Sequence, residues 1–305
     1  LTPSQRAQYL NEQILLARGG LIASSTLVEA LAAFQNESDQ TVWEIISLAI
    51  SDLKKFVDQD EAAEKLLRRL SGNLARRQFE RLGWSKHPGE PEADSKLRAA
   101  IIDCMLYSED AAAISTARQL YQNTPLAELS ADLRPSIIGA ASVRYSNQPA
   151  DIVSQLLEAY QATQSADLRS DIAAGITATR DAEQLARLIG LLTDTDIIRS
   201  QDTVHWFVDL LRNRYGREAA WRWMRDQWSW IEQTFASDKS HDYFPRYAAM
   251  LLMTRQQLAE YREFFTPLRR DQSLVRAIDM GILDLEGKLD LIDRDKAAVI
   301  AALAK

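Results

Sequence analysis

The stretch from Gln148 to Leu192, QPADIVSQLLEAYQATQSADLRSDIAAGITATRDAEQLARLIGLL, decides the fold class because it holds three short apolar-periodic segments separated by brief polar breaks. Within each segment the apolar residues recur at helical spacing, and convincing alternation of apolar and polar residues is absent. We therefore predict helices over 148–163, 166–179 and 181–192. With no strand to pack upon, each helix must bury its apolar stripe against its neighbours.

The same pattern extends over the rest of the chain. A first helix is predicted to begin with Thr2 as N-cap and Pro3 at the first helical position, and to stop at Gly19 and Gly20. Its apolar stripe is Ala7, Leu10, Ile14 and Ala17. Two long helices are predicted over 38–57 and 60–83, and two shorter ones over 108–122 and 133–145.

These segments predict an all-α protein, an α-superhelix of HEAT-like stacked antiparallel helix pairs with a concave face. The likeness to HEAT repeats is architectural, because no strict repeat signature is present. A chain of 305 residues exceeds the usual size of a single core. We expect one helical domain over 1–305, with possible sub-parts at 1–84 and 91–305.

Four of the seven tryptophans lie in AAWRWMRDQWSW, residues 219–230. Trp223 and Trp230, seven residues apart, define one stripe of a predicted single helix, and the opposite stripe is Trp221, Met224, Trp228, Ile231 and Phe235. A helix that is apolar on two sides is an inner helix, so core packing is favoured. The alternative is that the tryptophans form a platform for a ligand. Core packing is favoured less strongly over this alternative for Trp223 and Trp230 than for Trp221 and Trp228.

The composition of the chain argues against two classes of binding partner. The net charge of −7 and the sequence pI near 5.2 argue against nucleic acid or an anionic membrane as a partner, because phosphate binding needs a basic face. No run of 18 uncharged apolar residues exists, and the N-terminal residues do not form a signal peptide. A single cysteine excludes an intrachain disulfide and favours a cytoplasmic location, and its apolar surroundings predict that Cys104 is a packed thiol.

Catalytic signatures are missing from the sequence. There is no HExxH, GxSxG, P-loop, GxGxxG or CxxC motif. His205 and His241 stand in isolated contexts, and each is expected to be a surface or capping residue rather than a metal ligand. We therefore predict no catalytic residue, no metal ligand and no cofactor-binding residue in this chain.

Several segments nevertheless resemble a known family when they are taken in order. They are LTPSQRAQYLNEQILLARGG (1–20) with Arg6, TVWEIISLAISDL (41–53) with Trp43, RLGWSKHPGEPEADSKLRAA (81–100) with Leu82, Gly83, Trp84, Gly89, Glu90, Leu97 and Arg98, IIRSQDTVHWFVDLLRNRYGREAAWRWMRDQW (197–228), and SLVRAIDMGILDLEGKLDLIDRDKAAVIAAL (273–303) with Arg276. Together they resemble the C-terminal helical domain of aminopeptidase N-type zinc aminopeptidases, a relative of the domain in endoplasmic-reticulum aminopeptidases. The likeness covers nearly the whole chain.

This resemblance implies a part of a larger enzyme. In the family, an amino-terminal β-domain and a thermolysin-like domain that binds zinc through HExxH precede the helical domain. The helical domain arches over the zinc site and encloses a chamber that admits peptides. The chain is thus expected to be the wall and gate of that chamber and inactive alone, with the catalytic domain of the same polypeptide and peptide substrates as partners.

Three residues are candidates for holding the distal end of a peptide, namely Arg199, Gln201 and Arg246. Arg199 and Gln201 lie in the family's Ile-Arg-x-Gln-Asp segment, where Gln201 and Asp202 could equally open the helix that carries Trp206. Arg246 could equally pair with a neighbouring Asp. A free-standing α-solenoid that binds peptides or proteins is the alternative function, and an enzyme acting alone is disfavoured by the absent motifs.

Overall fold

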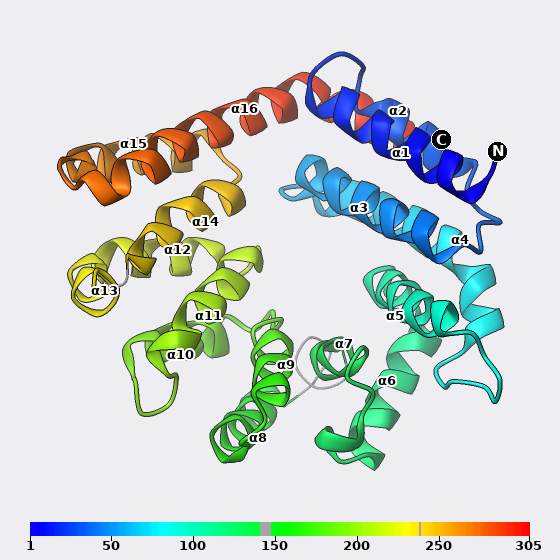
Figure 1. The fold of residues 1–305 in the computed structure, drawn as a ribbon, viewed down its shortest axis with the longest axis horizontal. Coiled ribbons are helices and arrows are strands. Elements are labelled where there is room, and N and C mark those ends of the chain that lie inside the picture. Colours follow the sequence, from blue (N-terminus) through cyan, green and yellow to red (C-terminus); the bar gives the residue numbers. More distant parts are fainter. Residues whose placement is uncertain (141–147, 238) are drawn as a thin grey trace. The chain divides into compact units, whose positions relative to one another are not determined.

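The computed structural model describes residues 1–140, 148–237 and 239–305, and within these ranges the chain is helical and contains no strand. The all-α fold class is therefore confirmed (Figure 1). Short 3-10 helices are η1 (Leu126–Glu128), η3 (Leu191–Thr193), η4 (Ser240–Asp242) and η5 (Thr266–Arg270). The α-helices are α1 (Pro3–Arg18), α2 (Ser25–Ala32), α3 (Gln40–Val57), α4 (Glu61–Leu82), α5 (Glu92–Tyr107), α6 (Ala111–Asn123), α7 (Arg134–Ile138), α8 (Pro149–Ala162), α9 (Ala166–Ile176), α10 (Ala182–Gly190), α11 (Ser200–Arg212), α12 (Arg217–Asp226), α13 (Trp228–Phe235), α14 (Tyr243–Leu251), α15 (Arg255–Phe265) and α16 (Gln272–Leu303).

The helices form two compact units. Unit 1 comprises 1–116 and 290–305, and unit 2 comprises 117–289. These boundaries fall within α6 and α16, whereas the expected sub-parts met between residues 84 and 91. The single domain with those sub-parts, and the HEAT-like superhelix with its concave face, stay predictions.

Unit 1 is built around α3, α4 and α5, which pack against one another, with α1 against α3. Local signals set the ends of α1 as predicted: Thr2 forms a capping box with Gln5, and Gly19 is the C-cap. The buried residues of α1 are the predicted stripe, Ala7, Leu10, Ile14 and Ala17. From α3, Trp43 is fully buried, and its indole N–H donates to the Glu37 carbonyl at 3.0 Å.

Unit 2 follows the predicted succession of short helices (Figure 1). The three helices predicted over 148–192 correspond to α8, α9 and α10, and α9 packs against both α7 and α8. Of the helix predicted over 133–145, the structure has α7 at Arg134–Ile138, and residues 141–145 lie outside the described part of the chain. No helix of the described residues is both long and apolar enough to cross a bilayer.

The tryptophan-rich segment is two helices, so the prediction of one helix was wrong. The break is at Gln227, whose backbone (φ −101°, ψ 17°) closes α12 and precedes α13. Asp226, Trp228 and Ser229 flank the break and are weak helix formers. The Trp228 ring also packs edge-on against Phe264 and Phe265, with ring centroids 5.8 and 5.5 Å away.

Burial supports the core interpretation of the cluster. Trp221 is fully buried, Trp223 and Trp228 are 8% and 6% exposed, and Trp230 is half-buried. Burying a large aromatic side chain contributes roughly 2–3 kcal/mol, so core packing accounts for the cluster without a ligand.

Candidate functional site

The predicted peptide-binding residues all lie on unit 2, on the helices α11 and α14, which pack against each other. Arg199 is the N-cap residue of α11, and Gln201 is in its first turn. Both side chains are exposed. They are therefore available to a ligand, although their role stays a prediction.

Gln201 and Asp202 both lie in the first turn of α11, so they open this helix, although no side chain forms a cap hydrogen bond there. Asp202 accepts a hydrogen bond from the Tyr160 hydroxyl at 3.1 Å. Burial raises the pKa of Tyr160 to about 12, so this hydroxyl stays protonated and donates. Asp202 thus ties α11 to α8 rather than capping its own helix.

Arg246 lies on the exposed face of α14 with 57% of its side chain accessible. Its guanidinium is 3.8 Å from the Asp242 carboxylate and stacks over the Tyr243 ring at 5.8 Å from the centroid. An exposed ion pair at this spacing is worth little, so Asp242 leaves Arg246 able to bind another carboxylate. Tyr243 and Tyr247 form a tilted ring pair beside it, with centroids 6.1 Å apart.

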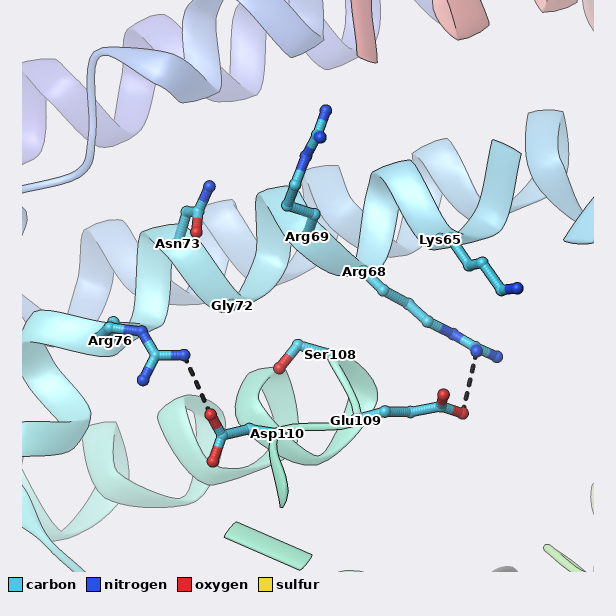
Figure 2. Close-up of a pocket in the computed structure, with 9 residues that line it drawn as sticks. All are labelled: Lys65, Arg68, Arg69, Gly72, Asn73, Arg76, Ser108, Glu109 and Asp110. Atoms are coloured by element: carbon cyan, nitrogen blue, oxygen red, sulfur yellow. Dashed lines mark hydrogen bonds and ion pairs between the residues drawn. The ribbon is translucent and has the colours of Figure 1, made fainter. Parts of the chain in front are cut away.

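A pocket of about 320 Å³ lies in unit 1, between α4 and the turn that joins α5 to α6 (Figure 2). This volume is at the lower end of the range for small-molecule sites. Its lining residues are Lys65, Arg68, Arg69, Gly72, Asn73, Arg76, Ser108, Glu109 and Asp110.

Two ion pairs join the opposite walls of this pocket, as Figure 2 shows. Arg68, only 6% exposed, lies 2.9 Å from a Glu109 oxygen, and Arg76 lies 3.0 Å from an Asp110 oxygen. Arg68 is also held by two carboxylates of its own helix, Glu64 at 3.1 Å and Glu61 at 3.7 Å. The buried Arg68 therefore holds the turn against α4, and the half-exposed Arg76 adds a weaker contact.

The turn that carries Ser108, Glu109 and Asp110 ends α5 in a left-handed conformation. Ser108 is the C-cap, Glu109 has φ 62°, and the Asp110 N–H donates to the Met105 carbonyl at 3.2 Å. This is a Schellman motif with Glu at the position that usually holds Gly, which costs about 1 kcal/mol. The ion pair with Arg68 helps to offset that cost.

Gly72 allows α4 to approach this turn closely. A Cβ on Gly72 would lie 2.9 Å from the Ser108 Cβ and 3.0 Å from its Oγ. A side chain at position 72 would therefore have to move the turn.

The remaining polar candidates are the single cysteine and the side chains that could bind a metal. Cys104 is buried, as predicted, and burial raises the pKa of its thiol to about 11. No group of three or more His, Cys, Asp or Glu side chains among the described residues could hold a metal ion.

His241 corrects one expectation. It is 1% exposed rather than at the surface, with Nε2 3.2 Å from the Ser273 hydroxyl and 3.4 Å from an Asp271 oxygen. Asp271 directly precedes α16 and Ser273 lies in its first turn, and nothing in the sequence around His241 indicates this tertiary contact.

Sequence reasoning missed the α4 pocket. Lys65, Arg69 and Arg76 share one helix face in the sequence, but such a row is usually a solvated face. The partner of Arg76, Asp110, follows α5, more than 30 residues later, and only tertiary packing brings Gly72 and Ser108 together.

Comparison with known proteins gives the context of these residues. Over residues 1–286 the chain matches the family model described as the ERAP1-like C-terminal domain. It is 32% identical over 307 residues to aminopeptidase N of Lactobacillus helveticus, covering 100% of this chain and 36% of that protein. It is 34% identical over 298 residues to aminopeptidase N of Lactococcus lactis subsp. cremoris strain MG1363, covering 97% and 35%.

A more distant relative is aminopeptidase A of Gloydius brevicauda, with 23% identity over 264 residues, 86% of this chain and 27% of that protein. The chain spans little more than a third of the length of the aminopeptidase N relatives it matches. Because the family model covers almost all of the chain, this protein belongs to the family of ERAP1-like C-terminal domains.

Proposed function

We propose that this chain is the C-terminal domain of an aminopeptidase N-type zinc enzyme, in which it forms the wall and gate of the substrate chamber and holds the distal end of peptides. The observation that carries the proposal is the similarity of the whole chain to about a third of aminopeptidase N. The zinc and its HExxH ligands, implied by the resemblance, would belong to another domain of the same polypeptide. A cytoplasmic location stays a prediction of the single cysteine.

The exposed groups on α11 and α14 suit such a role. Arg199 and Arg246 offer guanidinium groups that can grip a carboxylate through two hydrogen bonds, and Gln201 offers an amide. Tyr243, 42% exposed, adds an aromatic face beside Arg246. Binding the remote part of a peptide orients the scissile bond, and a wall that excludes water strengthens electrostatic interactions at the metal.

A complementation experiment tests this function. The 305-residue chain is added to a truncated aminopeptidase N that lacks its own C-terminal part, and hydrolysis of an aminoacyl-anilide and of a nonapeptide is followed. We expect association and restored hydrolysis of the nonapeptide. Failure to associate would count against the proposal, and stable capture of other partners would favour the free-standing scaffold.

The role of the three residues is tested in the complemented enzyme. Arg199→Gln, Gln201→Ala and Arg246→Gln should each raise the KM for the nonapeptide about threefold to tenfold, because each removes a contact to the distal end. The aminoacyl-anilide has no distal end, so its KM should not change. Arg222→Gln, at another exposed arginine of unit 2, is the matched control. Equal effects on both substrates would contradict the assignment.

A further inference from the structure

We propose that one exposed face of α16, formed by Met280, Leu283 and Gly287 and bordered by Met250 of α14, is the surface on which another domain of the same polypeptide docks. This inference rests on the proposed function, because it takes the chain to be the C-terminal part of a longer enzyme. It goes further by naming the side chains that meet the rest of that enzyme. All four residues of this α16 face belong to unit 2.

The α16 face presents large apolar side chains to water. Met280 and Leu283 are 50% and 63% exposed, and they lie one turn apart on the helix. Met250, at the end of α14, is 60% exposed. The end of α14 crosses α16 at this level, since Lys288 donates to the Met250 carbonyl at 2.9 Å and to the Ala249 carbonyl at 3.0 Å. Single exposed apolar residues are ordinary, whereas several that share one face mark an interaction surface.

Gly287 gives a second, independent indication. It lies in the interior of α16, where glycine is a poor helix former, and no heavy atom lies within 4 Å of the position of its Cβ. Its φ is not in the left-handed region either. Nothing in the described part of the chain therefore requires glycine here. Because Gly287 follows Leu283 by four residues, the missing side chain leaves a notch beside Leu283 that an approaching surface can enter.

The size of the α16 face indicates which partner covers it. Freely diffusing proteins that form a stable complex bury about 800 Å² each, more than three side chains and a glycine supply, so this face alone does not hold a second copy of the chain. A covalently linked domain faces it at an effective concentration of about millimolar, so a small apolar contact suffices. The chain spans 36% and 35% of its aminopeptidase N relatives, in which the larger part of the polypeptide lies outside the matched region.

The side chains also indicate the chemistry of the partner surface. Methionine is unbranched and polarizable, so Met250 and Met280 can adapt to an apolar ridge that enters beside Leu283. Methionine is enriched at protein interfaces, whereas charged residues are depleted from their centres. Arg276 and Asp284, both exposed, border the face on α16 as a polar rim. The surface that docks here is therefore an apolar patch with charges only at its edge.

Hydroxyl-radical labelling, read for each residue by mass spectrometry, tests this proposal. The 305-residue chain alone is compared with a fusion in which it replaces the C-terminal part of an aminopeptidase N. We expect the labelling of Met250, Met280 and Leu283 to fall at least fivefold in the fusion. Tyr215, 45% exposed between α11 and α12 of the same unit, is the reference and should be labelled equally in both proteins.

Hydrolysis of the nonapeptide by the same fusion separates this inference from the proposed function. A fusion that hydrolyses the nonapeptide while the α16 face stays labelled overturns the inference alone. A protected face without hydrolysis supports docking and contradicts the chamber role, and absence of both overturns both. Protection in the isolated chain, on raising its concentration or on adding the nonapeptide, would assign the face to a second copy or to substrate and overturn the proposal.

Two variants change the α16 face and should leave the fold of the isolated chain intact, which circular dichroism checks. Leu283→Glu places a charge in the face, and Gly287→Gln fills the notch, which is open in this structure. Each should raise the labelling of Met280 in the fusion at least threefold, because the partner surface no longer fits. Leu21→Glu, at a 76% exposed leucine of unit 1, is the matched control and should leave this labelling unchanged. An equal rise in the control would contradict the assignment.

Discussion

Gly281 of α16 lies directly against the phenol ring of Tyr261 of α15. A Cβ on Gly281 would lie 3.0 Å from the Tyr261 Cζ and 3.1 Å from the Ala249 Cβ of α14. The Tyr261 side chain is fully buried, and its hydroxyl donates to the Pro245 carbonyl at 3.1 Å. The absence of a side chain at Gly281 is therefore what lets α14, α15 and α16 meet.

Two glycines of α16 should respond to alanine in opposite directions. Gly281→Ala should destabilise unit 2 by about 1–3 kcal/mol, because the added methyl group overpacks a buried ring. Gly287→Ala should stabilise the protein by about 0.5–1 kcal/mol, because nothing lies within 4 Å of its Cβ and alanine is the better helix former. Urea unfolding measures both, and a shift of the same sign for the two variants would contradict this account.

Acid should destabilise unit 1 through Glu90. The hydrogen bond from the buried Arg98 lowers the pKa of Glu90 from 4.5 to about 2. A carboxyl group whose pKa is lower in the folded than in the unfolded state stabilises the fold. This contribution is complete when the pH is above the pKa of the unfolded state. This contribution is lost as the pH falls from 4.5 toward 2.

Glu90→Gln should therefore lower the urea midpoint at neutral pH and flatten its fall over that acid range. Glu92→Gln, two residues later at an 84% exposed side chain, is the control and should leave the profile unchanged. An unaltered acid profile in Glu90→Gln would show that Glu90 is not the responsible group.

The strained turn at Glu109 gives a third prediction. Glu109→Gln keeps the left-handed backbone and loses the charge that faces Arg68, so it should be less stable than the native chain. Glu109→Gly loses the same charge but also relieves the strain, so it should be more stable than Glu109→Gln by roughly 1 kcal/mol. Equal stability of the two variants in urea would mean that the turn stores no strain.

The aromatic cluster of unit 2 contains a fully buried tryptophan, Trp221, and a half-buried one, Trp230, which should contribute differently to stability. Trp221 stacks on Tyr261 at 6.2 Å, and its indole N–H donates to a Glu260 oxygen at 2.7 Å. Trp221→Ala should cost about 3–5 kcal/mol of unfolding free energy. Trp230→Ala should cost clearly less, because Trp230 is only half-buried. Thermal unfolding followed by circular dichroism compares the two variants, and equal losses would contradict the assignment.

The parts of this fold that could be predicted from the sequence are those set by residues close together in the chain. Thr2, Pro3 and Gly19 set the ends of α1 through bonds to residues within a few positions, so spacing and capping rules found them. The break at Gln227 lies beside Trp228, whose ring packs on Phe264 and Phe265, more than 30 residues away, and no pattern in the surrounding sequence indicates those contacts.

The same distinction applies to the candidate sites. Arg199 and Gln201 are predicted from a segment that resembles the family, and the structure adds that these two side chains and that of Arg246 are exposed. The α4 pocket requires Gly72 to meet Ser108, a contact between helices that neither residue type indicates.

The helix α16 runs unbroken through the boundary between the two units, with residues 272–289 in unit 2 and 290–303 in unit 1. Ile278 and Leu285 are fully buried before the boundary, and Asp295 and Val299 are buried after it. Each half of α16 therefore has to keep its buried residues at helical spacing, because one residue inserted within either half would turn the residues that follow it by about 100° away from the core of that unit.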